Sequence, residues 1–382
     1  MKSSKKLLSL LLTLCLVFGM CTAACAEESA APELKPFTIG MLDMGAWNAT
    51  SGPQYAQIEL AAKALNAEIV YTSYDNSAEG LLIALQNLIG QGVDAILMQN
   101  GPLVQGCIPQ MAEICDEAGV YWALCWTKIV EGDGNYEACM DSEYFVGTFY
   151  EDDVRSGEFT VETIGNLGST KVAEIGFVTG NATADMRDEG VARGLEKYSD
   201  IEILAEERDQ TLTSTSDGGK TIMDRFITSV PELDGLVICG MSQFVLSGVV
   251  SSLEEHGLTE QVQVGCIDFH EYQTEYLKSG VLDGIIGGHV VGPYYGLILI
   301  ANIINGTPLT EEKVVLQDNF IELTSYDDAV AWDTYGKPGE IYSAEETVNM
   351  IQAVNPDFTY DSFLEVINNY SLDDIVARNS GK

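Results

Sequence analysis

The segment FTIGML, Phe37 to Leu42, is an apolar run of strand length, and the stretch that follows, Tyr55 to Leu65, has apolar residues at helical spacing. A second strand-like run, Glu68 to Tyr71, comes next, and a second helical stretch, Gly80 to Ile89, follows it. Short apolar runs that alternate with amphipathic helices are typical of βαβ units with a parallel sheet. This order predicts an α/β fold with helices on both faces of the sheet.

The same alternation fills most of the chain, in two runs separated by a polar stretch, Lys128 to Glu143. The first run ends with strand Ala95 to Met98, helix Ile108 to Ala118 and strand Val120 to Leu124. The second run is expected to hold helix Val154 to Ile164, strand Val172 to Val178, helix Ala184 to Tyr198, strand Ile201 to Ala205, helix Gly219 to Ser229, strand Leu236 to Cys239, helix Phe244 to His256, strand Val262 to Ile267, helix Tyr272 to Ser279 and strand Leu282 to Ile286. Two such runs predict two similar doubly wound parallel-sheet lobes.

The amino terminus has the pattern of an export signal. Three lysines, at positions 2, 5 and 6, precede an apolar run from Leu7 to Met20 and a set of small residues that ends at Ala26. The apolar run is shorter than the roughly 20 residues that a membrane-spanning helix needs. We expect residues 1–26 to be a signal peptide cleaved after Ala26, with a lipid anchor at Cys25 or Cys21 as the alternative. The protein is then exported, to the periplasm or to the outer face of the cell membrane.

The chain of 382 residues is strongly acidic, with 19 Lys+Arg against 58 Asp+Glu and a formal net charge of −39. Loss of residues 1–26, which hold three lysines and no acid, would make the charge −42. Proteins bind nucleic acid largely by neutralising its phosphates with Lys and Arg, so this charge excludes nucleic acid as a partner. A strongly anionic ligand is also disfavoured, because it would approach against a field of its own sign.

Six cysteines lie outside the signal segment: Cys107, Cys115, Cys125, Cys139, Cys239 and Cys266. In an oxidising compartment an even number is compatible with disulfide bonds. Three of the six, at positions 125, 239 and 266, lie inside apolar strand-like runs, where a free cysteine behaves as a small buried hydrophobe. We therefore expect buried thiols rather than disulfide bonds.

Motifs for catalysis, cofactors and metals are mostly absent. No G-x-G-x-x-G follows a strand, and the Gly-Lys-Thr sequence at 219–221 lacks the first glycine of a phosphate loop, because Ser214 stands there. The histidines at 256, 270 and 289 form no H-x-x-x-H pair that would suit zinc. We expect no cofactor, no metal site and no enzymatic activity, while a cysteine–histidine nucleophile pair without a local signature stays open.

Polar and aromatic residues gather at the carboxyl ends of the predicted strands, where ligands bind in open α/β sheets. These segments are Asp43 to Asn48, Gln99-Asn100, Cys125 to Thr127, Thr179 to Asp185, Gly240 to Gln243 and Asp268 to His270. Aromatic faces can cover the C–H-rich side of a small ligand while amides, carboxylates and hydroxyls pair with its hydroxyl groups. The pattern favours a small polyhydroxylated ligand.

Several short motifs occur in a fixed order between residues 37 and 306. They are RDEGV at 187–191 after a strand ending GFVTG at 176–180, DAIL at 94–97, Asp152-Asp153 with Gly157, PELDG at 231–235, Val264-Gly265 with Asp268, and GVLDG at 280–284. In this order the chain resembles the type I periplasmic-binding proteins of the ribose- and galactose-binding kind, which are solute-binding subunits of bacterial ABC importers. The resemblance implies two lobes joined by a hinge of three crossings, near Glu151, Gly288 and Asp318.

The resemblance also implies domain limits. Lobe 1 is expected at residues 37–150, completed by 289–317, and lobe 2 at 151–288, completed by 318–325. Residues 326–382 are expected to form a helical C-terminal extension to which no role is assigned.

Ligand contacts are implied at the Trp47-Asn48 loop, at Trp126, at the hydroxyl-binding Arg187 and Asp268, and near the last crossover. Together with strand-end residues, the expected ligand-binding set is Trp47, Asn48, Asn100, Trp126, Arg187, Ser242, Asp268 and His289. Structural alternatives stay open: Arg187 could pair with a neighbouring aspartate, and Asp268 could cap the next helix. The chain departs from the family pattern at Cys125, Met241-Ser242 and Cys266-Ile267, which argues against the usual hydrogen-bond set for a simple pentose or hexose.

The function implied is that of an extracytoplasmic monomer that captures a small neutral polar ligand, in first place a sugar, and delivers it to an ABC permease. Closure of the lobes would be favoured by contacts that exist only when both walls are near the ligand. Other ligands stay open, namely a nucleoside, an amino acid or a signalling molecule read by a sensor kinase. A hydrolytic enzyme is the remaining alternative.

Overall fold

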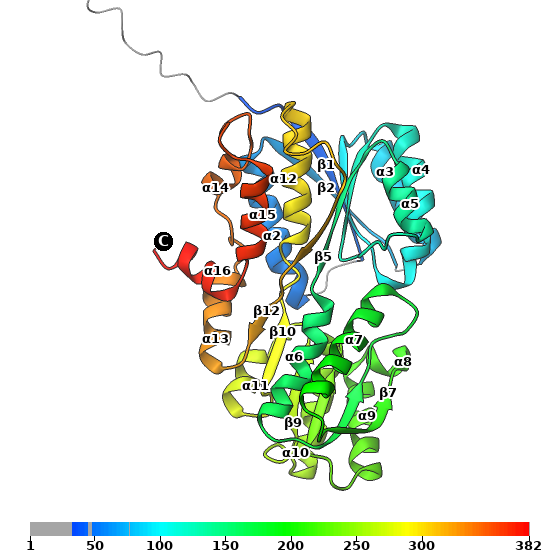
Figure 1. Ribbon diagram of the computed structural model, residues 1–382, viewed down its shortest axis with the longest axis vertical. Coiled ribbons are helices and arrows are strands. Elements are labelled where there is room, and N and C mark those ends of the chain that lie inside the picture. The colour runs from blue at the N-terminus through cyan, green and yellow to red at the C-terminus, as the bar shows by residue number, and fades with distance from the viewer. Residues whose placement is uncertain (1–32, 45–47, 76, 382) are drawn as a thin grey trace, which may run out of the picture. The chain divides into compact units, whose positions relative to one another are not determined.

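The structure is a computed structural model that describes residues 33–44, 48–75 and 77–381, and the chain from Leu34 onward forms one compact unit. The predicted signal peptide lies outside the described residues. Within them the chain forms two six-stranded sheets, each with helices on both faces (Figure 1). The predicted α/β fold of two doubly wound lobes is confirmed.

Lobe 1 is built on a wholly parallel sheet with the strand order β2-β1-β3-β4-β5-β11. Its strands are β1 (Phe37–Asp43), β2 (Ala67–Ser73), β3 (Ala95–Gln99), β4 (Tyr121–Cys125), β5 (Phe145–Glu151) and β11 (Val314–Asp318). Its helices are α2 (Asn48–Ala64), α3 (Ala78–Gly90), the 3₁₀ helix η1 (Pro102–Cys107), α4 (Ile108–Ala118), α5 (Gly134–Asp141) and α12 (Gly292–Asn305). Every residue of the central strand β3 is buried, because helices cover both faces of the sheet.

Lobe 2 repeats the plan with the strand order β7-β6-β8-β9-β10-β12. Its strands are β6 (Lys171–Ile175), β7 (Glu202–Glu207), β8 (Gly235–Ile238), β9 (Gln263–Ile267), β10 (Gly284–Gly287) and β12 (Ile321–Leu323). Its helices are α6 (Asp153–Asn166), α7 (Ala182–Lys197), α8 (Gln210–Thr213), α9 (Ser216–Ser229), α10 (Ser242–His256) and α11 (Gln273–Ser279). The edge strand β12 is antiparallel to β10, whereas its counterpart β11 is parallel to β5.

Two helix starts that border the space between the lobes carry side-chain caps. The Asp152 carboxylate accepts the backbone N–H of Arg155 at the start of α6, and the Asn181 amide oxygen accepts that of Ala184 at the start of α7. Such caps satisfy amide groups that have no partner inside the helix. They fix where α6 and α7 begin, and both helices supply residues to the site described below.

The polar stretch Lys128 to Glu143 holds an element that the sequence pattern does not predict. Helix α5 begins after Asp133, whose carboxylate caps it, and buries only Cys139. The following strand β5 is buried along its whole length and is also not predicted, because its sequence FVGTFYE mixes glycine, threonine and an acid with the apolar residues. Burial on both faces, rather than apolar periodicity, defines this strand.

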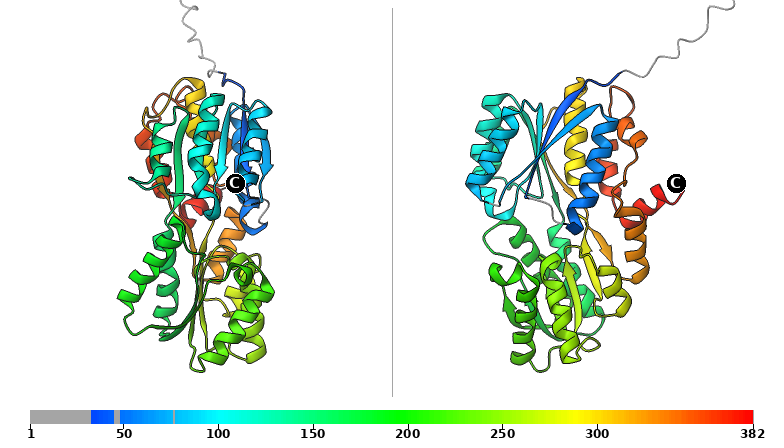
Figure 2. Two further views of the ribbon diagram at one scale, coloured as in Figure 1. Left: turned by 90° about the vertical axis from the view of Figure 1, so that its right-hand side faces the viewer. Right: turned by 180° about the vertical axis from the view of Figure 1, so that it is seen from behind.

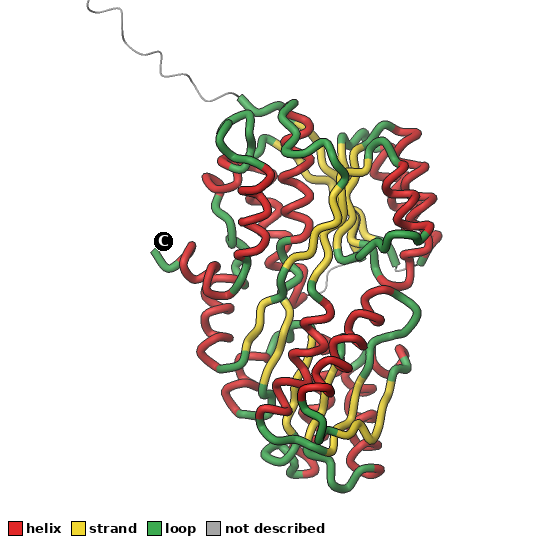
Figure 3. Tube along the Cα trace, viewed as in Figure 1, coloured by secondary structure: helices red, strands yellow, loops and turns green. Residues whose placement is uncertain are grey.

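The C-terminal extension is helical and packs beside lobe 1 and lobe 2. It comprises α13 (Tyr326–Ala331), the π-helical turn η2 (Trp332–Gly336), α14 (Ala344–Asn349), α15 (Tyr360–Asn369) and α16 (Leu372–Asn379). Figure 2 shows α14 and α15 beside α2 and α12 of lobe 1, and Figure 3 shows the extension as a group of helices flanking both sheets.

The six cysteines of the described chain are free and buried, which confirms the prediction of buried thiols. Among the described residues, no helix is both long enough and apolar enough to cross a bilayer.

Candidate functional site

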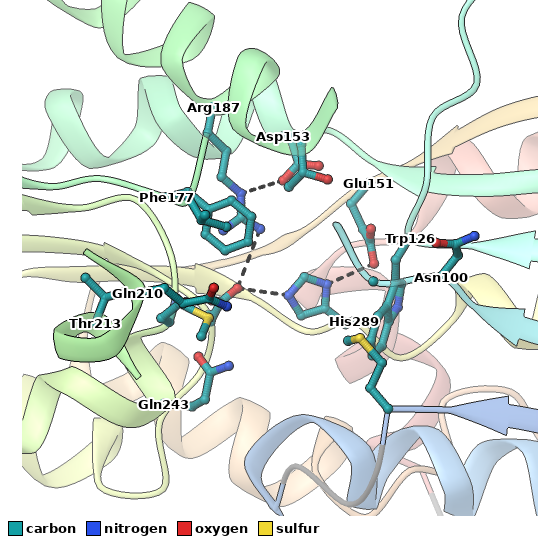
Figure 4. A pocket seen from close by; sticks show the side chains of 16 residues that line it. Asn100, Trp126, Glu151, Asp153, Phe177, Arg187, Gln210, Thr213, Gln243 and His289 are labelled. Carbon is teal, nitrogen blue, oxygen red and sulfur yellow. Dashed lines mark hydrogen bonds and ion pairs between the residues drawn. The ribbon is translucent and has the colours of Figure 1, made fainter. Parts of the chain in front are cut away.

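A cavity lies where the two lobes meet (Figure 4), and it encloses about 860 Å³ of empty space, part of which is open to solvent. Its walls come from the ends of strands and the starts of helices in both lobes. The lining residues are Met44, Asn100, Gly101, Trp126, Glu151, Asp153, Phe177, Val178, Thr183, Arg187, Gln210, Thr213, Met241, Gln243, Asp268 and His289. This is the edge at which the carboxyl ends of both parallel sheets point, so the topology itself places the site there.

Two of the lining residues hold equivalent places in the two lobes. Trp126 follows β4, the fourth strand of lobe 1, and its backbone N–H donates to the carbonyl of Phe149 at 2.8 Å. Asp268 follows β9, the fourth strand of lobe 2, and its backbone N–H donates to the carbonyl of Ile286 at 2.8 Å. The same turn therefore delivers an aromatic ring from one lobe and a carboxylate from the other.

Backbone strain is concentrated at this cavity. In the described part of the chain, four residues other than glycine have positive φ, and three of them line the cavity: Trp126 (68°), Met241 (62°) and Asp268 (76°). The left-handed conformation costs such residues roughly 1–2 kcal/mol each, and it persists only where the surroundings enforce it. Strain of this kind gathers at functional sites, which supports the cavity as the working part of the molecule.

The Arg187 guanidinium is buried and pairs with a carboxylate and a backbone carbonyl of the protein. Its Nε donates to the Asp153 carboxylate at 2.7 Å, one terminal nitrogen donates to the carbonyl of Cys239 at 3.0 Å, and the other lies 3.7 Å from Asp268. Its carbon centre lies 4.8 Å from the centroid of the Phe177 ring. Arg187 comes from α7 and Asp153 from α6, so this pair holds two lobe 2 helices together at the cavity wall.

His289 bridges two carboxylates from different strand ends. Its Nδ1 lies 2.9 Å from Glu151 at the end of β5, and its Nε2 lies 3.0 Å from Asp268 after β9. Burial lowers the pKa of His289, but the two carboxylates outweigh that effect and raise the pKa to about 10. The imidazole is therefore a permanent cation at neutral pH, and Figure 4 shows it in the middle of the line of charged groups.

The two aspartates that flank Arg187 differ in pKa. Burial raises the pKa of Asp268, but the Arg187 charge and the hydrogen bonds from His289 and from the Met241 amide lower it to about 2. Burial raises the pKa of Asp153 to about 6; Arg187 opposes this rise, and the nearby Glu151 adds to it. Asp268 is thus ionised at neutral pH, where it faces the cations Arg187 and His289. Asp153 titrates closer to neutral pH.

The remaining polar groups of the cavity are neutral, and several have no partner. Among the described residues, the Asn100 Oδ1, Trp126 Nε1 and Gln243 Oε1 atoms are buried and have no hydrogen-bond partner. The Asn100 side chain is 1% exposed, and its Nδ2 donates to the Met111 sulfur at 3.6 Å, which leaves the oxygen free to accept. Buried polar atoms of this kind normally have partners, so the two amides are open to a hydrogen-bond donor and the indole to an acceptor.

The structure brings together five of the residues that the sequence predicts for the site: Asn100, Trp126, Arg187, Asp268 and His289.

The described residues that line the cavity do not include the other three predicted residues. Trp47 lies outside the described residues, and Asn48 begins α2 with a side chain that the structure does not describe. Ser242 begins α10 with a fully buried side chain and is not among the lining residues, whereas its neighbours Met241 and Gln243 are.

Several lining residues are not predicted from the sequence. Glu151 and Asp153 are recognisable only as part of a hinge crossing, and no pattern in the sequence shows that their side chains point into the cavity. Phe177 lies inside a run that the pattern assigns to a strand, yet it follows β6 and faces Arg187. Gln210 comes from α8, a single turn with no apolar periodicity.

Within the described residues, no cluster of three or more His, Cys, Asp or Glu side chains could hold a metal ion. His270 Nε2 lies 3.0 Å from the Ser247 hydroxyl, but its Nδ1 accepts the backbone N–H of Tyr272. The proton therefore sits on Nε2, which donates to Ser247, so this histidine cannot act as the base for that serine.

Comparison with known proteins places the fold and the family. The chain is 26% identical over 267 residues to a xylitol-binding protein of Mycolicibacterium smegmatis, covering 69% of this chain and 70% of the relative. It superimposes with a TM-score of 0.71 on a periplasmic sugar-binding protein of Pseudomonas fluorescens, at 13% identity, covering 89% of this chain and 99% of that one. It superimposes with a TM-score of 0.64 on an ABC transporter periplasmic solute-binding protein of Actinobacillus succinogenes with bound D-allose, at 20% identity, covering 77% and 98%. The model of the periplasmic binding protein domain matches residues 47–303, so the chain belongs to the periplasmic-binding protein family, a family of binding proteins.

Proposed function

We propose that this protein captures a small neutral polyhydroxylated ligand, a sugar or a sugar alcohol, between its two lobes and delivers it to an ABC permease. The xylitol-binding relative and the family of periplasmic-binding proteins support this proposal. Membership of that family also indicates a location outside the cytoplasm, in agreement with the predicted export signal.

The observation that carries the proposal is the division of the cavity between paired charges and unpaired neutral groups. Asp268 is hydrogen-bonded to His289 and Arg187 to Asp153, whereas Asn100 and Gln243 each offer an acceptor without a partner. A hydroxyl group both donates and accepts, so one polyol can pair with amide oxygens on opposite lobes and with the indole N–H. Apolar surface from Trp126 and Phe177 suits the C–H faces of the same molecule.

The charges around the cavity favour a neutral ligand over an anion. Three carboxyl groups, Glu151, Asp153 and Asp268, face two cations, Arg187 and His289. A carboxylate or phosphate on the ligand would meet this excess of acid inside a chain of net charge −39. A neutral polyol meets no such penalty.

A hinge between the lobes would allow ligand binding to change the conformation of the protein. The cavity takes Asn100 and Trp126 from lobe 1 and Arg187, Gln243 and Asp268 from lobe 2. A ligand that touches both sets stabilises the closed arrangement over any arrangement in which the sets are apart. The closed form would then present its outer surface to the permease.

The test is a thermal-shift and calorimetry screen of the mature protein. The panel contains xylitol, myo-inositol, D-allose and other neutral sugars, with glucuronate, nucleosides and amino acids as comparison classes. A ligand at 100 times its dissociation constant stabilises the folded state by about 2.7 kcal/mol, a rise of several degrees in melting temperature. A shift with neutral polyols and none with glucuronate supports the proposal. Binding of nucleosides or amino acids alone, or no shift with any polyol, would overturn it.

A further inference from the structure

The C-terminal extension, residues 326–382, contacts both lobes on the side of the hinge away from the cavity. Figure 1 shows α13, α14 and α15 on the left of the crossings, whereas α8 and α7, which line the cavity, lie on the right. The view from behind shows the same arrangement (Figure 2). The extension therefore occupies the space that would narrow if the lobes moved apart on the cavity side.

The first part of the extension is anchored on lobe 2. The Trp332 side chain is 2% exposed and packs edge-on against Phe269, with ring centroids 4.9 Å apart. The Thr274 hydroxyl of α11 donates to the Asp333 carboxylate at 2.6 Å. Phe269 directly follows Asp268, the carboxylate that lines the cavity, so this anchor lies one residue from the site.

The second part is anchored on lobe 1. The Tyr342 ring stacks on Tyr294 of α12 with centroids 4.8 Å apart and 7° between the planes, and its hydroxyl lies 2.8 Å from that of Tyr295. The Gln57 side chain of α2 donates to the Tyr342 carbonyl at 3.1 Å and accepts its N–H at 2.9 Å. The residues in this contact are fully buried, so this part of the extension is built into the lobe 1 core.

The two parts of the extension contact each other, and the extension also contacts the chain crossing at Gly288. Arg378 of α16 forms an ion pair with Glu346 of α14, and its guanidinium lies 5.0 Å from the Tyr342 centroid. Helix α16 also packs on η2, which carries Trp332. The Tyr370 hydroxyl donates to the carbonyl of Gly288 at 3.4 Å, at one of the three crossings. The extension is therefore a continuous packed body that spans the lobe boundary.

We infer that the extension limits how far the two lobes can open. Trp332, acting through Phe269, also positions the Asp268 loop against lobe 1. A close-packed interior has low compressibility, so lobe opening must either compress this body or break its contacts with one lobe. Restricting the open state raises the fraction of molecules that are ready to bind, which tightens the apparent affinity. This inference rests on the proposed function only in assuming that the cavity holds a ligand.

The experiment measures the distance between the lobes directly. Spin labels are placed on introduced cysteines at Glu113 of α4 and Ala192 of α7, both exposed, while the six buried native thiols stay in place. Distances are recorded without ligand and with xylitol as the probe. Trp332→Ala should lengthen the ligand-free distance and weaken binding of the probe about tenfold, as expected if the binding-ready fraction falls tenfold. Trp332→Phe, which keeps an aromatic edge, should stay near the parent in both measurements.

A milder pair of variants keeps the test decisive if Trp332→Ala does not fold. Asp333→Ala removes the bond to Thr274, and Asp327→Ala removes an exposed carboxylate of α13 as the matched control. The first should shift the ligand-free distance in the same direction by a smaller amount, and the control should not. Lower melting temperatures with unchanged distances would show a merely structural role and overturn the inference. Because the ligand-free distances need no ligand, they decide the inference even if xylitol does not bind, and the proposed function is judged separately by the whole panel of polyols.

Discussion

His289 shows how one side chain can join the two halves of the site. Its ring bonds Glu151 on one side and Asp268 on the other, and both contacts are 3.0 Å or shorter. A side chain without charge at this position would leave two buried carboxylates near each other without the cation between them. Removing one partner from a buried charged network is costly because the remaining charges lose their compensation.

This arrangement predicts a specific pH dependence of stability. The pKa of His289 is about 10 in the folded protein against an ordinary value of 6.5. Its charged contacts therefore contribute fully below pH 6.5, and the contribution is lost as the pH rises toward 10. Urea unfolding of the parent should show this decline, and His289→Gln should show a flatter curve over the same range and a free energy of unfolding lower by about 1.5–3 kcal/mol at neutral pH. Parallel curves for the two proteins would contradict the assignment.

Asn100 and Gln243 carry a second prediction, about affinity rather than stability. Their side-chain oxygens have no partner among the described residues, so truncation breaks no hydrogen bond to those oxygens in the free protein. Asn100→Ala or Gln243→Ala should weaken binding of a neutral polyol by up to about tenfold, since a hydrogen bond contributes about 0.5–1.5 kcal/mol. Calorimetry measures the affinity, and Gln261→Ala, on the far side of lobe 2 with its amide bonded to the Leu233 carbonyl, is the control. Unchanged affinity in both cavity variants would remove these amides from the site.

At the scale of elements, the alternation of strands and helices was largely predictable because buried parallel strands are continuous apolar runs. Strands β1, β3 and β9 are of this kind. The exceptions have physical reasons: β5 mixes residue types and is recognised only by its burial between two neighbours. Within the site, Arg187 and Asp268 were predictable from motif order, whereas Glu151 and Asp153 were not, because only the path of the chain from β5 into α6 brings their side chains to the cavity.

The turn between β8 and α10 allows the cost of backbone strain to be measured. Met241 caps α10 at φ 62°, a conformation that glycine adopts freely. Met241→Gly should keep or raise the free energy of unfolding, by up to about 1 kcal/mol, whereas the β-branched Met241→Val should lower it. Chemical denaturation of the two variants beside the parent checks the order. A glycine variant less stable than the valine variant would show that side-chain packing, not backbone conformation, dominates at this turn.

At the scale of the whole molecule, charge distinguishes ligand classes. The chain carries −39, and its cavity has more carboxyl groups than cations. Xylitol binding should be nearly constant as salt rises from about 0.01 M to about 1 M, over which the Debye length falls from about 30 Å to about 3 Å. Any weak binding of glucuronate should instead strengthen with salt, because screening reduces the repulsion. Calorimetry across this series measures both, and a strong salt dependence for the neutral ligand would contradict the charge argument.

The six free thiols have a consequence for how the molecule matures and how it can be followed. All are buried, and burial raises the pKa of each, to about 12 for Cys139 and Cys266. Within the described chain no cross-link has to form before the lobes are complete, so folding there does not wait for an oxidase or an isomerase. A thiol reagent can attack these cysteines only when the chain around them opens. The rate at which the reagent modifies these cysteines therefore measures how often each lobe opens locally.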